Sequence, residues 1–130
     1  MSRWLGSEAG QAKLARLRDN DPELLGLVLN DNDVGDDGAT AIAEGLKTNS
    51  ALQSLDLNRN NVGDAGKAAL LAVLEGHPSL KSIYGIGWAG SEAGQAELAR
   101  LRDNDPELVR LYLSWKGVGD DGATAIAEGL

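Results

Sequence analysis

The stretch that decides the fold is LLGLVLNDN at residues 24–32, in which three leucines and an asparagine stand at fixed spacing. The same phrase, LxxLxLxxN, returns 28 residues later in LQSLDLNRN at residues 52–60. Partial copies follow at residues 80–88 and 108–116. A period in this range is typical of a solenoid, in which each repeat forms one short unit and packs on its neighbours.

The phrase is followed by a second repeated block, VGDDGATAIAEGL at residues 34–46, which returns with changes at 62–74 and unchanged at 118–130. Alternation in the first block predicts a half-buried strand, and the alanine and isoleucine spacing of the second predicts one apolar helix face. The strands should be parallel because a helix crosses over between them. Strands are expected near residues 25–29, 53–57, 81–85 and 109–113, and helices near 8–18, 37–47, 65–75, 92–102 and 121–130.

These repeats resemble the ribonuclease-inhibitor type of leucine-rich repeat, which is also found in NOD-like receptors and in activators of the Ran GTPase. The resemblance rests on LxxLxLxxN and VGDxGAxAxAxxL at a 28-residue period and covers the whole chain. It implies an α/β leucine-rich-repeat solenoid, a fragment of a curved horseshoe with parallel strands on the concave face and helices on the convex face. We expect one domain over residues 1–130, with repeats at about 1–20 (partial), 21–48, 49–76, 77–104 and 105–130 (truncated).

The chain also copies itself, since residues 4–46 match residues 88–130 at all but nine positions. Seven of the nine differences fall in 25–33 and 109–117, where strand positions 26, 28 and 30 should point away from the leucines. One interpretation is that a scaffold was kept and a recognition surface diversified. The alternative is drift at solvent-facing positions, although drift should also have changed the helix faces, where only Lys13 and Glu97 differ.

The expected concave face is rich in tyrosine, tryptophan and arginine, which bury large areas at interface hot spots. The family resemblance also implies binding on this face, by analogy. We therefore expect a protein partner on this face. For Tyr112 and Trp115 the alternative is that they pack at an unprotected end of the solenoid. The predicted contact residues are Val28, Asn30, Asp56, Asn58, Arg59, Tyr84, Arg110, Tyr112, Ser114 and Trp115.

Composition narrows the kind of partner. The formal net charge of -8 argues against nucleic-acid binding and mildly favours a basic protein. The chain has no cysteine, which excludes disulfides and thiol chemistry. No apolar run approaches membrane-spanning length and residues 1–10 do not resemble a signal sequence, so we expect a cytoplasmic protein without membrane contact.

Motifs that suggest chemistry are weak. GIGWAG at residues 85–90 matches the GxGxxG of a dinucleotide-binding turn, but the acidic residue expected after the next strand is missing. The acidic run at 31–37 resembles a calcium loop, but Gly35 and Ile42 stand where ligands are needed. His77 is the only histidine, and its position where a helix stops predicts a capping or loop role. We expect no enzyme, no cofactor and no metal.

Helix starts are predicted from side chains that can accept the N–H groups of a first turn. Asp36, Asp64 and Asp120 stand ahead of three helices, and Ser7 and Ser91 ahead of the other two.

The asparagine of the phrase predicts loop contacts. Asn32 and Asn60 should hydrogen-bond the loop backbone of adjacent repeats, which the indole of Trp88 cannot do. Near Trp88, Gly85 and Gly90 replace a core leucine and a core valine. We expect the Trp88 ring to fill the volume that these glycines leave, and Trp4 to repeat the arrangement.

The ends of the chain suggest a second function. Residue 1 begins within a repeat and Leu130 closes a helix without a polar capping repeat, which predicts a fragment of a longer array, such as a NOD-like-receptor-type protein. Open ends could stack head to tail or exchange segments. A self-assembling homo-oligomeric scaffold is therefore the alternative to a binding module.

Overall fold

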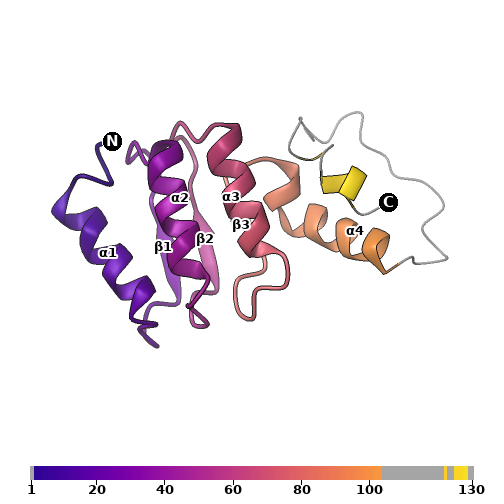
Figure 1. Ribbon diagram of the computed structural model, residues 1–130, viewed down its shortest axis with the longest axis horizontal. Coiled ribbons are helices and arrows are strands. Elements are labelled where there is room, and N and C mark those ends of the chain that lie inside the picture. The colour runs from indigo at the N-terminus through magenta and orange to yellow at the C-terminus, as the bar shows by residue number, and fades with distance from the viewer. Residues whose placement is uncertain (1, 104–121, 123–124, 129–130) are drawn as a thin grey trace.

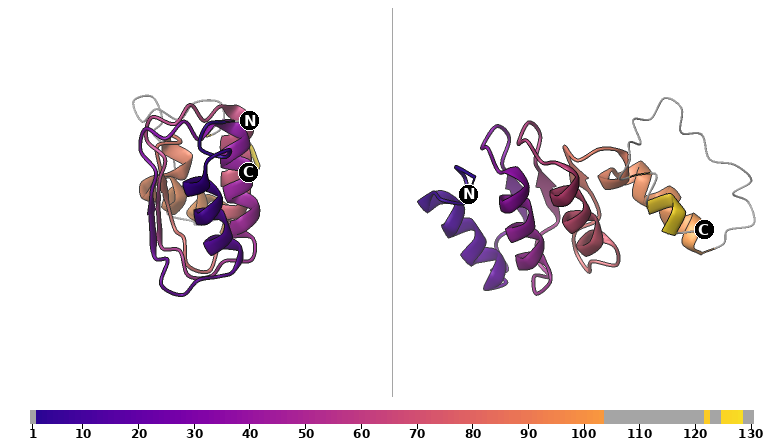
Figure 2. Two further views of the ribbon diagram at one scale, coloured as in Figure 1. Left: turned by 90° about the vertical axis from the view of Figure 1, so that its left-hand side faces the viewer. Right: turned by 45° about the horizontal axis from the view of Figure 1, so that its top comes forward.

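The computed structural model describes residues 2–103, 122 and 125–128, and its elements form two layers (Figure 1). A parallel sheet forms one layer, and helices α1 to α3 lie side by side on the other, as the view along the row shows (Figure 2). The strands are β1 (Gly26–Val28), β2 (Ser54–Asp56) and β3 (Ile83–Tyr84). The helices are α1 (Glu8–Arg18), α2 (Gly35–Leu46), α3 (Asp64–Leu74), the 3-10 helix η1 (Trp88–Gly90) and α4 (Glu92–Arg102).

The strands pair in a register whose partners are 28 residues apart. Leu27 lies beside Leu55, and Leu55 beside Ile83. These three side chains are almost completely buried and belong to one core with leucines and isoleucines from the helices. The parallel orientation of the strands is confirmed for the three that the structure describes, whereas the strand expected at 109–113 lies outside the described residues.

The predicted helices are confirmed for α1 to α4, whose ends fall within two residues of the expected bounds. Residues 122 and 125–128, within the fifth expected helix, are also helical. A repeated glycine of α2 and α3 lies close to the segment that precedes it in the stack. A Cβ on Gly66 of α3 would lie 3.0 Å from the Cβ of Ala39 of α2, and a Cβ on Gly38 would lie 3.2 Å from Cε3 of Trp4. Close helix packing therefore requires the smallest residue at this position.

The serine caps are confirmed. Ser7 Oγ accepts from the backbone N–H of Gly10 at 2.9 Å, and Ser91 Oγ accepts from that of Gly94 at the same distance. In both cases the serine is the N-cap of its helix.

The prediction that Asp36 and Asp64 cap the helices that follow them is wrong. Neither α2 nor α3 is capped by a side chain of its own repeat, because α2 already begins at Gly35 and α3 begins at Asp64 itself. The Oδ1 atom of Asp36 instead accepts from the N–H groups of Gly63 at 2.5 Å and Gly66 at 3.3 Å, at the start of α3. A helix start is thus satisfied by the preceding repeat. The third predicted cap, Asp120, lies outside the described residues.

The asparagine prediction is confirmed at one position. Asn60 is buried, and its Oδ1 accepts from the backbone of Asn32 at 2.8 Å while its Nδ2 donates to the carbonyl of Leu29 at 2.7 Å. Asn32 is exposed and its amide reaches only the carbonyl of Asn30, in its own loop. In the amino-terminal segment the N–H of Gly6 is bonded to Ser2 O at 3.1 Å, and the N–H groups of Arg3 and Trp4 are bonded to Asp33 rather than to Asn32.

Trp4 and Trp88 are buried as predicted, but the expectation that Trp88 fills the volume left by the glycines is wrong. A Cβ on Gly90 would lie 2.5 Å from Cγ1 of Ile86, and a Cβ on Gly85 would lie 2.5 Å from the backbone nitrogen of Asn58. The glycines therefore leave no space, since Ile86 and the neighbouring backbone already occupy it. Trp88 packs in a second cluster with Ala89 and Leu98, whereas Trp4 is part of the main core.

Candidate functional site

The face of the sheet turned away from the helices, here called the open sheet face, is formed by Gly26, Val28, Ser54, Asp56 and Tyr84. Val28 is 70% exposed and Tyr84 is 49% exposed. Within the described residues, the one further large apolar side chain that stays exposed is Leu25, at 48%, directly before β1. The exposed large apolar side chains of the described residues thus lie on the strands or directly beside one.

One row of side chains crosses this face. Val28 pairs with Asp56, and Asp56 with Tyr84. Because neighbouring strands lie about 4.8 Å apart, the three side chains are immediate neighbours. The face therefore presents an aliphatic, an acidic and an aromatic group in sequence.

The central carboxylate is held in place by neutral donors. Oδ1 of Asp56 accepts from the backbone N–H of Asn58 at 3.0 Å. The side-chain amide of Asn30, in the orientation that the hydrogen bonds require, donates to both oxygens of Asp56 at 2.7 and 3.2 Å. These bonds fix the carboxylate without neutralising its charge.

The loops after β1 and β2 are joined by a surface ion pair. Arg59 Nη2 lies 3.0 Å from Oδ2 of Asp31, with both side chains more than half exposed. Both residues have left-handed backbone conformations, with φ of 58° and 59°, so the two loops turn alike. An exposed pair contributes about 0–1 kcal/mol, and its main effect here is to hold the guanidinium beside Asp31.

The predicted contact residues divide into three groups. Val28, Asp56 and Tyr84 lie together on the open sheet face, and Asn30, Asn58 and Arg59 lie in the loops that follow it. Leu25 was missed, because alternation counted back from Leu27 places position 25 on the buried side, whereas Leu24 is buried and Leu25 is exposed. Four predicted residues lie outside the described residues: Arg110, Tyr112, Ser114 and Trp115.

The differences between the two copies of the sequence acquire a further explanation. Asn30 contacts Asp56 of the next repeat, and Asp31 contacts Arg59 of the next repeat. In the second copy of the sequence these two positions hold serine, at 114, and tryptophan, at 115. Oδ1 of Asp33 likewise accepts from Asn61 at 3.5 Å, and glycine stands at 117. Some variable positions therefore serve contacts between repeats as well as the open face.

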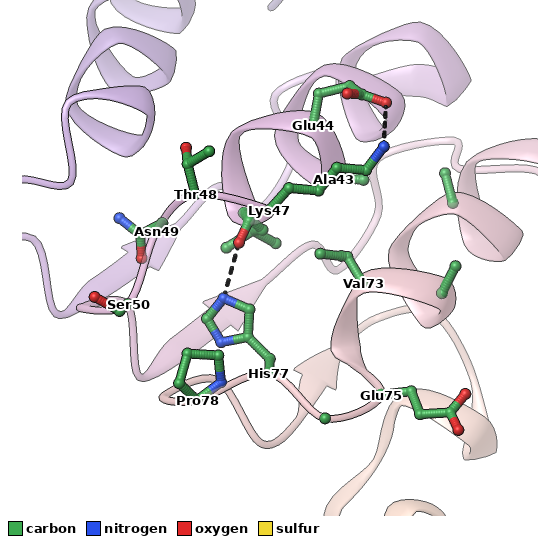
Figure 3. Close-up of a pocket in the computed structure, with 14 residues that line it drawn as sticks. Ala43, Glu44, Lys47, Thr48, Asn49, Ser50, Val73, Glu75, His77 and Pro78 are labelled. Atoms are coloured by element: carbon green, nitrogen blue, oxygen red, sulfur yellow. Dashed lines mark hydrogen bonds and ion pairs between the residues drawn. The ribbon is translucent and has the colours of Figure 1, made fainter.

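A groove of about 520 Å³ lies on the other layer, between the ends of α2 and α3 (Figure 3). His77 at its edge is buried, and its Nε2 lies 3.0 Å from the carbonyl of Leu46. Its Nδ1 accepts from the N–H of Leu80 at 2.9 Å, so the proton is on Nε2, which donates to Leu46. The predicted loop role of His77 is confirmed, with both ring nitrogens used by the backbone.

Asn49, one repeat earlier, makes the equivalent pair of hydrogen bonds to the backbone. Its Nδ2 donates to the carbonyl of Leu17 at 3.2 Å and its Oδ1 accepts from the N–H of Leu52 at 2.9 Å. The imidazole of His77 thus replaces an amide in a structural position, which favours a structural over a chemical role.

The GxGxxG segment is likewise explained by packing. Gly85 and Gly87 have φ of 97° and 94°, and the space beside Gly85 is filled by the backbone of Asn58. The last three residues of the segment form η1, and α4 begins only after the Ser91 cap, so the first two glycines do not open a helix directly as in a dinucleotide-binding turn. In the described part of the chain, no three His, Cys, Asp or Glu side chains gather as a metal site would require.

Two carboxylates away from the sheet anchor neighbouring segments. The backbone N–H of Glu23 and then the side chain of Arg16 lower the pKa of Asp21 below its usual 3.8. The backbone N–H of Ser2, 2.6 Å from Oδ2, is the main cause that lowers the pKa of Asp37. Asp37 is exposed and Asp21 is half-buried, and both stabilise the structure near the amino terminus.

Comparison with known proteins finds a similarity in two segments. Residues 24–43 and 48–71 match the family model described as Leucine Rich repeat, so these two segments are similar to leucine-rich repeats. A solved structure titled Leiomodin-1 Actin-Binding Site 2 (ABS2) is similar at 19% identity and a TM-score of 0.47, over 95% of this chain and 90% of that chain. Comparison with curated proteins gave no match. Among the helices that the structure describes, none is long and apolar enough to cross a membrane.

Proposed function

We propose that this chain is a non-catalytic module that binds a protein partner on the open sheet face. The observation that carries this proposal is the concentration of exposed large apolar side chains, Leu25, Val28 and Tyr84, at two strands of one sheet. Grouped exposed apolar side chains mark interaction surfaces, and tyrosine is enriched at interface hot spots.

We further propose that the sheet lines the concave side of a curved solenoid of the ribonuclease-inhibitor type, with one domain of 28-residue repeats over residues 1–130. The 28-residue register of the strand pairs supports this period. Neighbouring strands are about 4.8 Å apart whereas packed helices are about 8–10 Å apart, so stacking strand–helix units bends the stack toward its sheet.

The proposed partner is a protein with a basic contact surface. The net charge of -8 supports this choice and disfavours nucleic acid, whose phosphates would be repelled. The contact set remains the predicted one, with Arg110, Tyr112, Ser114 and Trp115 extending the face in the next repeat. A cytoplasmic location also stays a prediction.

Site-directed photo-crosslinking tests the surface. A photoreactive residue at position 28 or 84 should capture a partner that the same residue at Ala68, exposed on α3, does not capture. Replacing Tyr84, Tyr112 and Trp115 together with alanine should abolish capture while the circular-dichroism spectrum is unchanged. Equal capture by a photoreactive residue at position 68 would show that the binding surface is not the open sheet face. Normal capture by the triple alanine variant would show the same.

Self-assembly is the second candidate function, because β1 is an edge strand of the described sheet. The N–H and C=O groups along such an edge can pair with another chain. Light scattering at increasing protein concentration distinguishes the two functions: a constant monomer mass supports the binding module, and a mass that rises with concentration supports the scaffold.

A further inference from the structure

We propose that Asp56 and Tyr84 form a subsite for one arginine side chain of the partner. This inference rests on the proposed function, because it names the group that the partner places at the centre of the open sheet face. It is carried by the geometry of the row Val28, Asp56, Tyr84 and by the charges around it.

The carboxylate of Asp56 is oriented but not paired with a cation. Its donors, the amide of Asn30 and the N–H of Asn58, are both neutral. A carboxylate offers about four acceptor positions, and the three contacts present leave capacity on Oδ2. Among the described residues Asp56 has no ion pair, so a preoriented anion faces solvent between two strands.

Tyr84 and Val28 supply the walls that a guanidinium group needs. A cation interacts with an aromatic ring within about 6 Å, and Tyr84, 49% exposed, is the strand neighbour of Asp56 at about 4.8 Å. A guanidinium can stack on the ring while its N–H groups bond the carboxylate. Val28 on the other side can contact the methylene stem of the same arginine.

The surrounding charges favour an incoming cation. Arg59 is held by Asp31, and the Nζ of Lys81 donates to the carbonyl of His77 at 2.8 Å, in the turn before β3. Asp31 offsets the charge of Arg59, and Asp33 adds a further negative charge in the loop after β1. The subsite therefore lies in a negative field, in a chain that is itself acidic.

Titration of the ¹⁵N-labelled full chain with N-acetyl-arginine amide, followed by NMR, tests the subsite. Saturable shifts are expected for the amide signals of Val28, Asp56 and Tyr84. N-acetyl-citrulline amide, which has the same shape without the charge, should give no saturable shift. N-acetyl-lysine amide should bind more weakly than the arginine probe, because an ammonium neither stacks nor bonds in a bidentate manner.

Asp56→Asn should weaken arginine binding about fivefold, and Tyr84→Leu should weaken it by a smaller factor. Asp19→Asn, which removes an exposed charge at the end of α1, is the matched control and should leave binding unchanged. The ¹⁵N spectrum of each variant reports directly whether it is folded. Equal binding of citrulline and arginine, or unchanged arginine binding by Asp56→Asn, would overturn the subsite.

The two proposals can fail separately. If crosslinking captures a partner at position 84 but the arginine probe does not bind, the subsite is wrong and the binding face stands. If arginine binds at Asp56 but capture does not depend on the open sheet face, the proposed function is wrong and the subsite stands.

Discussion

Helices α1 and α4 are nearly the same peptide in two surroundings. Their sequences, EAGQAKLARLR and EAGQAELARLR, differ at one position, and both begin at a serine cap and end at an aspartate. Leu17 of α1 is completely buried against the main core, whereas its counterpart Leu101 is only half-buried. Figure 1 shows α4 inclined to the row of α1 to α3. Local sequence thus sets where a helix begins and ends, and its neighbours set how much of it is buried.

The largest expected effect separates these two leucines. Leu17→Ala should lower the free energy of unfolding by about 2–5 kcal/mol, because it leaves a cavity in a packed core. Leu101→Ala should cost less than about 1.5 kcal/mol, because its side chain is already half in water. Urea unfolding of the two variants measures the difference, and equal losses would show that α4 is buried as deeply as α1.

The second comparison is between two asparagines at the same position of the phrase. Asn60→Ala should cost about 2–3 kcal/mol, because buried backbone groups of Asn32 and Leu29 lose their partner. Asn32→Ala should change stability by less than about 0.5 kcal/mol, since that side chain is exposed. Thermal unfolding of both variants is the measurement. A large loss of stability in Asn32→Ala would mean that the Asn32 side chain also stabilises a neighbouring loop.

A third prediction tests the equivalence of His77 and Asn49. His77→Ala should cost about 2 kcal/mol, because the carbonyl of Leu46 and the N–H of Leu80 lose their partner. His77→Asn should recover at least half of this loss, since an amide already makes these bonds at Asn49. Urea unfolding at neutral pH compares them, and identical losses for both variants would contradict the equivalence.

The smallest effect is the acid dependence of the Ser2 to Asp37 contact. The pKa of Asp37 is lowered in the folded chain, so its stabilising contribution is present above the usual value of 3.8 and is lost as the pH falls through the lowered value. Wild type should therefore be more stable than Asp37→Asn at about pH 5, and the difference should vanish in stronger acid. Unfolding midpoints across this range measure it. A difference that persists in strong acid would assign it to packing.

The elements and the row on the sheet could be predicted because they depend on spacing within the chain. Alternation placed Leu27 inside and Val28 outside, and the 28-residue period placed Val28, Asp56 and Tyr84 together. The serine caps could be predicted because each serine bonds an N–H group only three residues further along the chain.

The failures concern contacts between repeats. Asp36 reaches the helix of the next repeat, and Ile86 fills the space expected for Trp88, neither of which local spacing indicates. Asn49 could have been found, because it stands 28 residues before His77 and both precede a buried leucine by three positions.

The junction of α2 and α3 is tied in both directions along the chain. Asp36 points forward to the amides of Gly63 and Gly66, and Asn60 points back to the backbone of Leu29 and Asn32. Neither repeat can open here without breaking bonds that belong to the other. Their amide protons should consequently exchange with solvent as a single cooperative unit, while the first turn of α1, which is capped by its own Ser7, can fray independently.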